Sequence, residues 1–302
     1  MSRVPSSTTE GTSGRLAGTT EGGGSVRVSV GCPDGMTVDV TVRGTGPPVL
    51  LIHGFGGSAA AWGESVLGRL ARRHRLLAVD LPGHGASDDP SGAERVSLAR
   101  VLDDLERVLD AAAVESCAWV GYSLGGRIAL AAALLRPARV ERLVLESASP
   151  GLATETERRE RRSADEALAR TIERDGVEAW IEEWELRPLF AGRARLPDER
   201  RERLLMLRRA NRPRALAAWL RGLGAGSQPS FWTRLTELAV PTMLVSGTCD
   251  HKYTGLGELM AGAIPRATHV AVEGAGHRVH LERPEPWLEA VLPFLTGEPP
   301  QR

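Results

Sequence analysis

Short apolar runs alternate with helical periodicities along most of this 302-residue chain. Runs typical of buried strands lie at 49–53, 76–80, 117–121, 142–147, 241–247 and 268–274, after two weaker strand patterns at 26–30 and 36–42. Apolar residues spaced as on one face of a helix recur at about 62–73, 97–113, 123–135, 255–263 and 284–295. This alternation predicts an α/β fold with a doubly wound, mostly parallel sheet.

The alternation stops between residues 150 and 238, where the chain is rich in Arg and Glu and has a helical pattern without a convincing strand. We therefore expect a core made of 25–149 and 239–302, with 150–238 inserted as a helical cap before the last two strands. Such a cap would lie over the carboxyl ends of the strands, where sheets of this kind bind ligands. Residues 1–24 are mostly Ser, Thr, Gly and Glu, and this composition predicts a disordered tail.

The bulk composition excludes several classes of function. With 38 basic and 38 acidic residues the formal net charge is zero, which gives no reason to expect a nucleic acid or a membrane as partner. No apolar run is long enough to span a bilayer. Three widely spaced cysteines favour neither a disulfide framework nor a zinc site and suit a reducing cytoplasm, so we expect no metal and no cofactor. The composition does not indicate which oligomeric state the protein has.

The strongest chemical signal is the sequence Gly121-Tyr122-Ser123-Leu124-Gly125, between a predicted strand and a predicted helix. A G-x-S-x-G in this context is typical of a nucleophile elbow, where the glycines permit a strained turn that exposes the serine hydroxyl. The alternative is a glycine-rich strand–helix turn with an incidental serine. In the same type of site the oxyanion hole would be formed by the backbone N–H groups of Leu124 and Phe55.

The acid and the base of such a triad follow the serine in the chain, in that order. Asp250 lies after the strand pattern at 241–247, and His277 lies after the one at 268–274, so we expect the triad Ser123, Asp250 and His277. Glu146, at the end of another strand pattern, is the rival for the acid.

The other histidines are weaker candidates for the base. We expect His53 and His84 to be structural, His74 to be solvated at a basic helix end, and His269 to be exposed at the start of a strand. His251 neighbours the acid, and His280 follows His277 by three residues.

Basic residues near the predicted triad indicate the charge of its ligand. Lys252 is the sole lysine of the chain and lies two residues after Asp250. Arg127 follows Ser123 by one helical turn and is either a ligand contact or a solvated arginine. The cap adds the cluster Arg158, Arg159, Arg161 and Arg162, most of it paired with nearby glutamates, and tryptophans that include Trp184. A small polyanionic molecule would suit such a pocket better than a neutral ester.

These motifs resemble one family of the α/β-hydrolase superfamily, 2-succinyl-6-hydroxy-2,4-cyclohexadiene-1-carboxylate synthase, a lyase of menaquinone (vitamin K2) biosynthesis. The resemblance covers about residues 49–295. It rests on three sequences, GYSLGGR at 121–127, ESASPGL with the following ERRERRSAD, and DHKY at 250–253, and is supported by WELRPLF at 184–190.

The resemblance implies elimination of pyruvate from 2-succinyl-5-enolpyruvyl-6-hydroxy-3-cyclohexene-1-carboxylate, a molecule with three carboxylates. It implies that Ser123, activated by His277, removes a proton alpha to the succinyl carbonyl. Substrate contacts are implied for Tyr122, Arg127, Arg161, Trp184 and Lys252.

Two other functions remain compatible with the motifs. The same triad serves carboxylesterases and C–C bond hydrolases of this superfamily, so the elbow alone does not separate a lyase from a hydrolase. A catalytically idle ligand sensor is disfavoured by the complete set of triad and oxyanion-hole residues.

Overall fold

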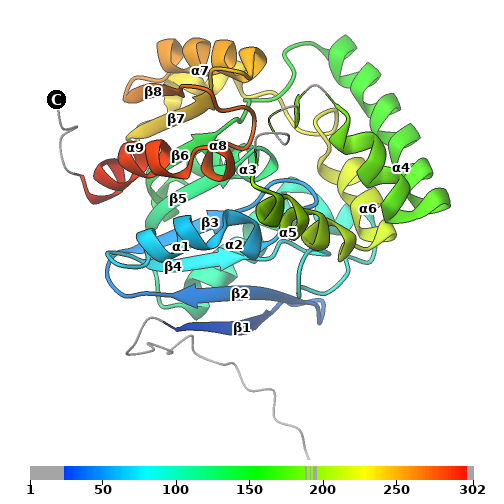
Figure 1. Ribbon diagram of the computed structural model, residues 1–302, viewed down its shortest axis with the longest axis horizontal. Helices are drawn as coiled ribbons and strands as arrows, with labels where there is room; N and C mark the ends of the chain where they lie inside the picture. The colour runs from blue at the N-terminus through cyan, green and yellow to red at the C-terminus, as the bar shows by residue number, and fades with distance from the viewer. Residues whose placement is uncertain (1–23, 188, 191, 193–195, 298–302) are drawn as a thin grey trace, which may run out of the picture.

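The computed structural model describes residues 24–297 except 188, 191 and 193–195. The predicted tail at 1–24 therefore lies almost entirely outside the described residues. An eight-stranded sheet runs through the molecule in the order β1-β2-β4-β3-β5-β6-β7-β8 (Figure 1). Its strands are β1 (Ser25–Gly31), β2 (Thr37–Arg43), β3 (Pro48–Ile52), β4 (Arg75–Val79), β5 (Cys117–Tyr122), β6 (Val140–Glu146), β7 (Thr242–Gly247) and β8 (Ala267–Val272).

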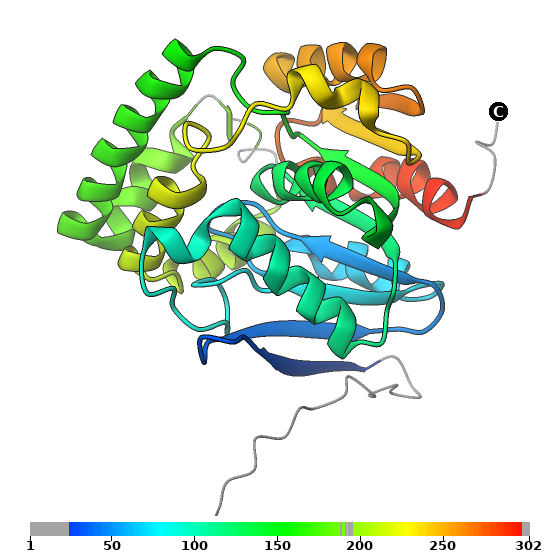
Figure 2. The same ribbon diagram turned by 180° about the vertical axis from the view of Figure 1, so that it is seen from behind.

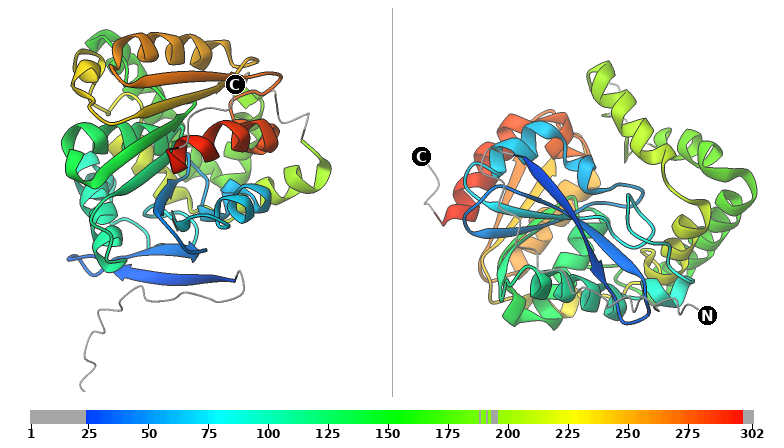
Figure 3. Two further views of the ribbon diagram at one scale, coloured as in Figure 1. Left: turned by 90° about the vertical axis from the view of Figure 1, so that its left-hand side faces the viewer. Right: turned by 90° about the horizontal axis from the view of Figure 1, so that it is seen from below.

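The first two strands differ from the rest of the sheet in direction. β1 pairs antiparallel with β2, β2 pairs antiparallel with β4, and every later pairing is parallel. The twist of the sheet is visible from below, where β1 crosses the other strands obliquely (Figure 3). The predicted α/β fold with a mostly parallel sheet is confirmed.

Helices cover both faces of the sheet, and the two faces can be followed in β3. Leu50 and Ile52 pack in a core with α2 (Leu98–Ala111), α3 (Leu124–Leu135) and part of α7 (His251–Ala263). Val49 and Leu51 point the other way, into a core with α1 (Glu64–Leu70) and α9 (Pro284–Thr296). Successive side chains of a strand point to opposite faces, so a continuous apolar run implies burial on both.

The insertion between β6 and β7 carries the helices α4 (Glu155–Glu185), α5 (Asp198–Arg209) and α6 (Pro213–Leu223), which lie together at one end of the sheet (Figures 1 and 2). α4 begins with a capping box between Thr154 and Glu157 and is interrupted at Gly176, whose φ is +83°. The cap has its own apolar core, which includes Trp180 and Leu216. Within the described residues, no helix is long and apolar enough to cross a membrane.

Candidate active site

Ser123 stands at the sharp turn between β5 and α3 with φ +52° and ψ −107°, a conformation that side-chain-bearing residues rarely adopt. Its backbone N–H donates to the carbonyl of Glu146 at 2.8 Å. A Cβ on Gly125 would lie 2.0 Å from the carbonyl oxygen of Ile52, and one on Gly121 would lie 2.3 Å from that of Gly125. The glycines of the motif are therefore required by close backbone packing around the strained serine.

The structure brings the three predicted triad residues together. The Ser123 hydroxyl lies 3.2 Å from Nε2 of His277, and Nδ1 of His277 lies 2.7 Å from Oδ2 of Asp250. Oδ1 of Asp250 accepts the backbone N–H of Tyr253 at 3.3 Å and caps α7. Because both oxygens of Asp250 are engaged, the carboxylate fixes the His277 ring with Nε2 toward the serine.

Burial controls the protonation of His277, which is only 1% exposed. Desolvation lowers the pKa of its imidazole below the usual 6.5, and the hydrogen bond and charge of Asp250 oppose this shift. The ring is therefore a neutral base at physiological pH, in position to take the proton of Ser123.

A cavity of about 480 Å³ opens over Ser123 between the strand ends and the cap. Both predicted oxyanion-hole residues line it, Phe55 from the loop after β3 and Leu124 at the first position of α3. The N–H of Leu124 has no acceptor within its own helix because it belongs to the first turn. Four arginine and lysine side chains line the cavity: Arg127 of α3, Arg161 of α4, Arg187 just after α4, and Lys252 of α7. Asp250 is the one acidic residue among the described lining.

Arg127 is partly buried and its guanidinium is hydrogen-bonded within the protein, so the alternative of a solvated helix arginine is wrong. Its guanidinium donates to the side-chain oxygen of Gln228 at 2.5 Å and to the carbonyl of Leu223 at 3.2 Å. Burial lowers its pKa to about 10, so the group stays charged at neutral pH. A partly buried cation whose described hydrogen-bond partners are neutral amides is suited to an anionic ligand.

Arg161 is the one member of the cap cluster that lines the cavity. It forms an ion pair with the buried Asp165, at 2.6 Å, whereas Arg158 and Arg162 both pair with Glu155 outside the cavity. Lys252 is exposed on the first turn of α7, with Nζ 5.6 Å from the centre of the Tyr253 ring.

Trp184 lines the cavity as expected, but Tyr122 does not. The Tyr122 ring packs against His277, with centroids 5.4 Å apart, beside the base. The motif WELR also contained a residue that sequence reasoning missed, Arg187, whose guanidinium lies 4.2 Å from the centre of the Trp184 ring. Their spacing of three residues was the available signal, since residues i and i+3 share a helix face.

A buried ion network, also missed by sequence reasoning, joins the cap to the triad. Glu185 of α4 binds Arg208 of α5 at 2.6 Å and Arg278, the neighbour of His277, at 2.8 Å. Phe190 lies under the Arg278 guanidinium at 4.2 Å and meets the His277 ring edge-on at 5.7 Å. No local pattern connects residues so far apart in the chain.

The remaining histidines test the other expectations. His53 and His84 are buried structural residues, since His53 accepts the N–H of Leu81 at 3.1 Å and Nε2 of His84 lies 3.2 Å from the N–H of Gly56. The expectation that His74 is solvated is wrong, because it is 1% exposed. His269 is partly buried rather than exposed and lies 2.8 Å from the Ser246 hydroxyl. Glu146, the rival acid, binds His280 instead of His277.

The chain is similar in sequence and in fold to several known proteins. A family model described as "alpha/beta hydrolase fold" matches residues 47–284. A Bacillus subtilis (strain 168) protein named "Putative 2-succinyl-6-hydroxy-2,4-cyclohexadiene-1-carboxylate synthase" is 38% identical over 91% of this chain and 99% of its own length. The "2-succinyl-6-hydroxy-2,4-cyclohexadiene-1-carboxylate synthase" of Salmonella agona (strain SL483) is 33% identical, over 82% of this chain and 94% of its own length. The solved structure of MenH from S. aureus superposes with a TM-score of 0.79 and 31% identity, covering 83% of this chain and 94% of that one.

Proposed function

The chain belongs to the alpha/beta hydrolase fold family and, within it, to the 2-succinyl-6-hydroxy-2,4-cyclohexadiene-1-carboxylate synthases of menaquinone biosynthesis, and on that premise we propose how it works. We propose that it is a carbon–oxygen lyase that releases pyruvate from 2-succinyl-5-enolpyruvyl-6-hydroxy-3-cyclohexene-1-carboxylate by means of Ser123, His277 and Asp250. The observation that supports this most is the meeting of a neutral base and four cations over one serine.

The first step is removal of the ring proton alpha to the succinyl carbonyl. His277 takes the proton of Ser123, and the resulting alkoxide takes the proton from carbon. Asp250 stabilises the imidazolium that forms on His277. Negative charge moves to the succinyl carbonyl oxygen, where the N–H groups of Phe55 and Leu124 would stabilise it.

The second step breaks the bond between the ring carbon and the enolpyruvyl oxygen. The electron pair of the enolate re-forms the carbonyl, the ring double bond shifts, and enolpyruvate leaves and is protonated to pyruvate. A carbon–hydrogen and a carbon–oxygen bond are broken, a second ring double bond is formed, and no water is consumed.

The four cations match a substrate with three carboxylates. Of the four, Arg127 lies nearest in the chain to Ser123, so we assign it to a carboxylate close to the reacting carbons. Arg161, Arg187 and Lys252 approach from the cap and from α7 and would hold the others. Trp184 offers a flat apolar wall, and Tyr122 supports His277 rather than contacting substrate.

Pyruvate release from the enolpyruvyl substrate tests this proposal, with Ser123→Ala as the matched control. We expect the wild type to release one pyruvate for each diene formed and the variant to lose all but a small fraction of the rate while keeping its melting temperature. Intact-mass measurement after a rapid quench should show unmodified protein. A covalent adduct on Ser123 would instead support a carboxylesterase or C–C bond hydrolase.

We also propose a cytoplasmic location for the enzyme. Cys32 and Cys117 are free thiols, and both are buried. Free thiols are usual in a reducing compartment.

A further inference from the structure

A second carboxylate–imidazole pair, Glu146 and His280, lies behind the proposed triad. Nδ1 of His280 is 2.7 Å from Oε1 of Glu146, and the backbone N–H of His280 donates to the same oxygen at 3.3 Å. Glu146 is fully buried and His280 is 2% exposed. A buried carboxylate is costly unless it is paired, so this contact is strongly favoured within the folded protein.

Both members of the pair are attached to the proposed triad through the backbone. Glu146 ends β6, and its carbonyl accepts the N–H of Ser123 in the strained elbow. His280 lies on the short helix α8 (Val279–Glu282), three residues after His277. The hydrogen bond between the Glu146 and His280 side chains therefore links the end of β6, which supports Ser123, to the segment that carries His277.

The ring of Tyr122 lies between the two imidazoles. Its centroid is 5.4 Å from that of His277 and 5.1 Å from that of His280. A Cβ on Gly54 would come within 2.7 Å of the ring, so there is no space on that side for Tyr122 to move. Burial raises the pKa of its phenol, which keeps the group neutral. The ring thus acts as a rigid apolar spacer between two histidines.

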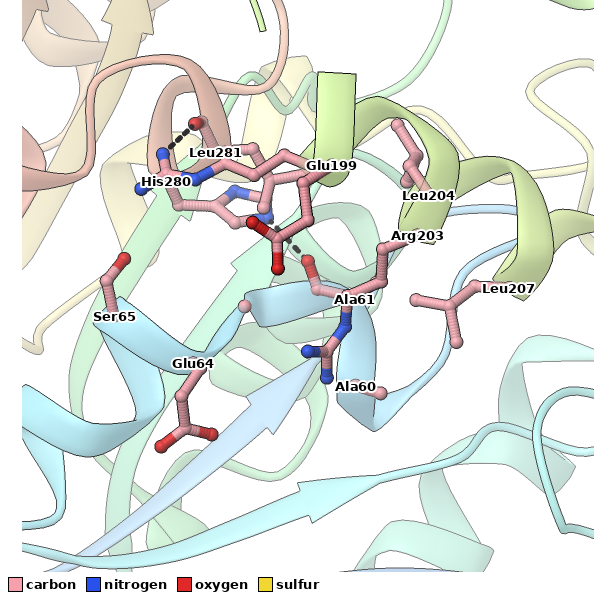
Figure 4. A pocket seen from close by; sticks show the side chains of 12 residues that line it. Ala60, Ala61, Glu64, Ser65, Glu199, Arg203, Leu204, Leu207, His280 and Leu281 are labelled. Atoms are coloured by element: carbon pink, nitrogen blue, oxygen red, sulfur yellow. Dashed lines mark hydrogen bonds between the residues drawn. The ribbon is translucent and has the colours of Figure 1, made fainter. Parts of the chain in front are cut away.

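His280 is confined on its outer side as well. It lines a separate cavity of about 190 Å³ between α5 and the core, where its ring points toward the carbonyl of Ala61 (Figure 4). Nε2 lies 3.3 Å from that carbonyl, and the rings of Trp62 and Trp287 lie 4.7 and 6.4 Å away. Held by these contacts, His280 transmits the position of Glu146 to Tyr122.

We propose that Glu146 and His280 are positioning residues that hold Tyr122, and through it the His277 ring, at the distance from Ser123 that proton transfer requires. The proposal rests on the proposed roles of Ser123 and His277. Neither residue lines the cavity over Ser123, so the pair acts on the rate of chemistry rather than on substrate binding. A misplacement of about 1 Å can lower a rate by about 10²-fold.

Three variants distinguish a positioning role of Glu146 and His280 from a contribution to the stability of the protein alone. Glu146→Gln keeps an oxygen that accepts the Nδ1–H of His280. His280→Asn keeps a nitrogen near Nδ1 for Glu146 but removes the ring edge that contacts Tyr122. The double variant Glu146→Leu/His280→Leu removes both polar groups, so no unpaired charge remains to unfold the protein. Asp104→Asn is the control, because Asp104 is equally buried in an ion pair with Arg95 at 2.7 Å, away from the site.

Two rates are measured for each variant, kcat for pyruvate release and the rate at which diisopropyl fluorophosphate labels Ser123. In the labelling reaction the serine oxygen bonds to phosphorus, fluoride leaves, and the serine proton passes to His277. Labelling therefore depends on the Ser123–His277 alignment whatever the natural substrate is. KM and the melting temperature are recorded alongside.

We expect His280→Asn and the double leucine variant to lose about 10- to 100-fold in both rates with KM within about threefold of wild type. Glu146→Gln should stay within about threefold, and Asp104→Asn should lose melting temperature but neither rate. If His280→Asn and the double variant keep both rates within twofold, or if KM rises as much as kcat falls, the proposal is wrong. The proposed function and the positioning role can fail separately. If Ser123→Ala keeps lyase activity, while His280→Asn and the double leucine variant label Ser123 more slowly as expected, the proposed function fails and the positioning role stands.

Discussion

The guanidinium of Arg127 donates to the side-chain oxygen of Gln228 at 2.5 Å, joining the helix that follows Ser123 to the segment that leaves the cap. Gln228 is 2% exposed and carries no charge. Arg127 is thereby held beside the serine by a neutral partner and keeps its full charge for a ligand. The arrangement makes Arg127 the cation whose loss should matter most.

Arg127→Ala should raise KM and lower kcat/KM for the three-carboxylate substrate by ~10- to 100-fold, because a partly buried, charge-assisted contact contributes about 1.5–3 kcal/mol. Gln228→Ala is the matched control: it removes the tie to the cap and leaves the cation. We expect Gln228→Ala to lower kcat/KM by less than about fivefold. Steady-state kinetics of pyruvate release checks both, and equal losses would make Arg127 a structural link only.

Lys252→Ala should have a smaller and salt-dependent effect. Lys252 is exposed at the mouth of the cavity, and an exposed ion pair contributes about 0.2–1 kcal/mol, or about 1.4- to fivefold in kcat/KM. Near 1 M salt, where the screening length is about 3 Å, wild type and variant should converge. The Arg127→Ala defect should persist there. A Lys252→Ala defect that is independent of salt would contradict its placement at the solvent-exposed rim.

The pH profile of kcat/KM should follow His277. The base is active when neutral, and burial lowers its pKa, so the midpoint of the decline in rate on acidification should lie below pH 6.5. Asp250→Asn removes the hydrogen bond and the charge that raise this pKa. The charge of Arg278, which lowers the pKa, and that of Glu146, which raises it, both remain. The acid limb should therefore move to lower pH while the plateau falls by ~10²- to 10⁴-fold. A limb that moves to higher pH would mean that another group titrates.

Gly125→Ala should destabilise the protein by about 3 kcal/mol or more, because the new Cβ would meet backbone that has little freedom to move. Gly262→Ala in α7 is the control, since nothing lies within 4 Å of a Cβ there. That change should stabilise by about 0.5–1 kcal/mol through helix propensity. Denaturant unfolding measures both. Similar free energies of unfolding for Gly125→Ala and wild type would show that the elbow can relax.

The sequence by itself determined the order of strands and helices, the nucleophile elbow and the chain order of Ser123, Asp250 and His277. These features follow from short-range rules: apolar runs mark strands buried on both faces, and glycines two residues either side of a serine mark a strained turn. The positions of the acid and the base after two later strands were predictable because the carboxyl ends of parallel strands meet at one edge of the sheet.

Only the tertiary structure decided which polar side chains face the site. Four arginines within five residues of the cap look alike in sequence, yet Arg161 alone of them lines the cavity, because helix rotation against the core selects one face. His74 and His280 are buried, and Arg127 is partly buried, by segments distant in the chain, and Glu146 binds His280 rather than His277 for the same reason. Local pattern specifies elements, but the partner of a buried charge is chosen by long-range packing, which a short stretch of sequence does not encode.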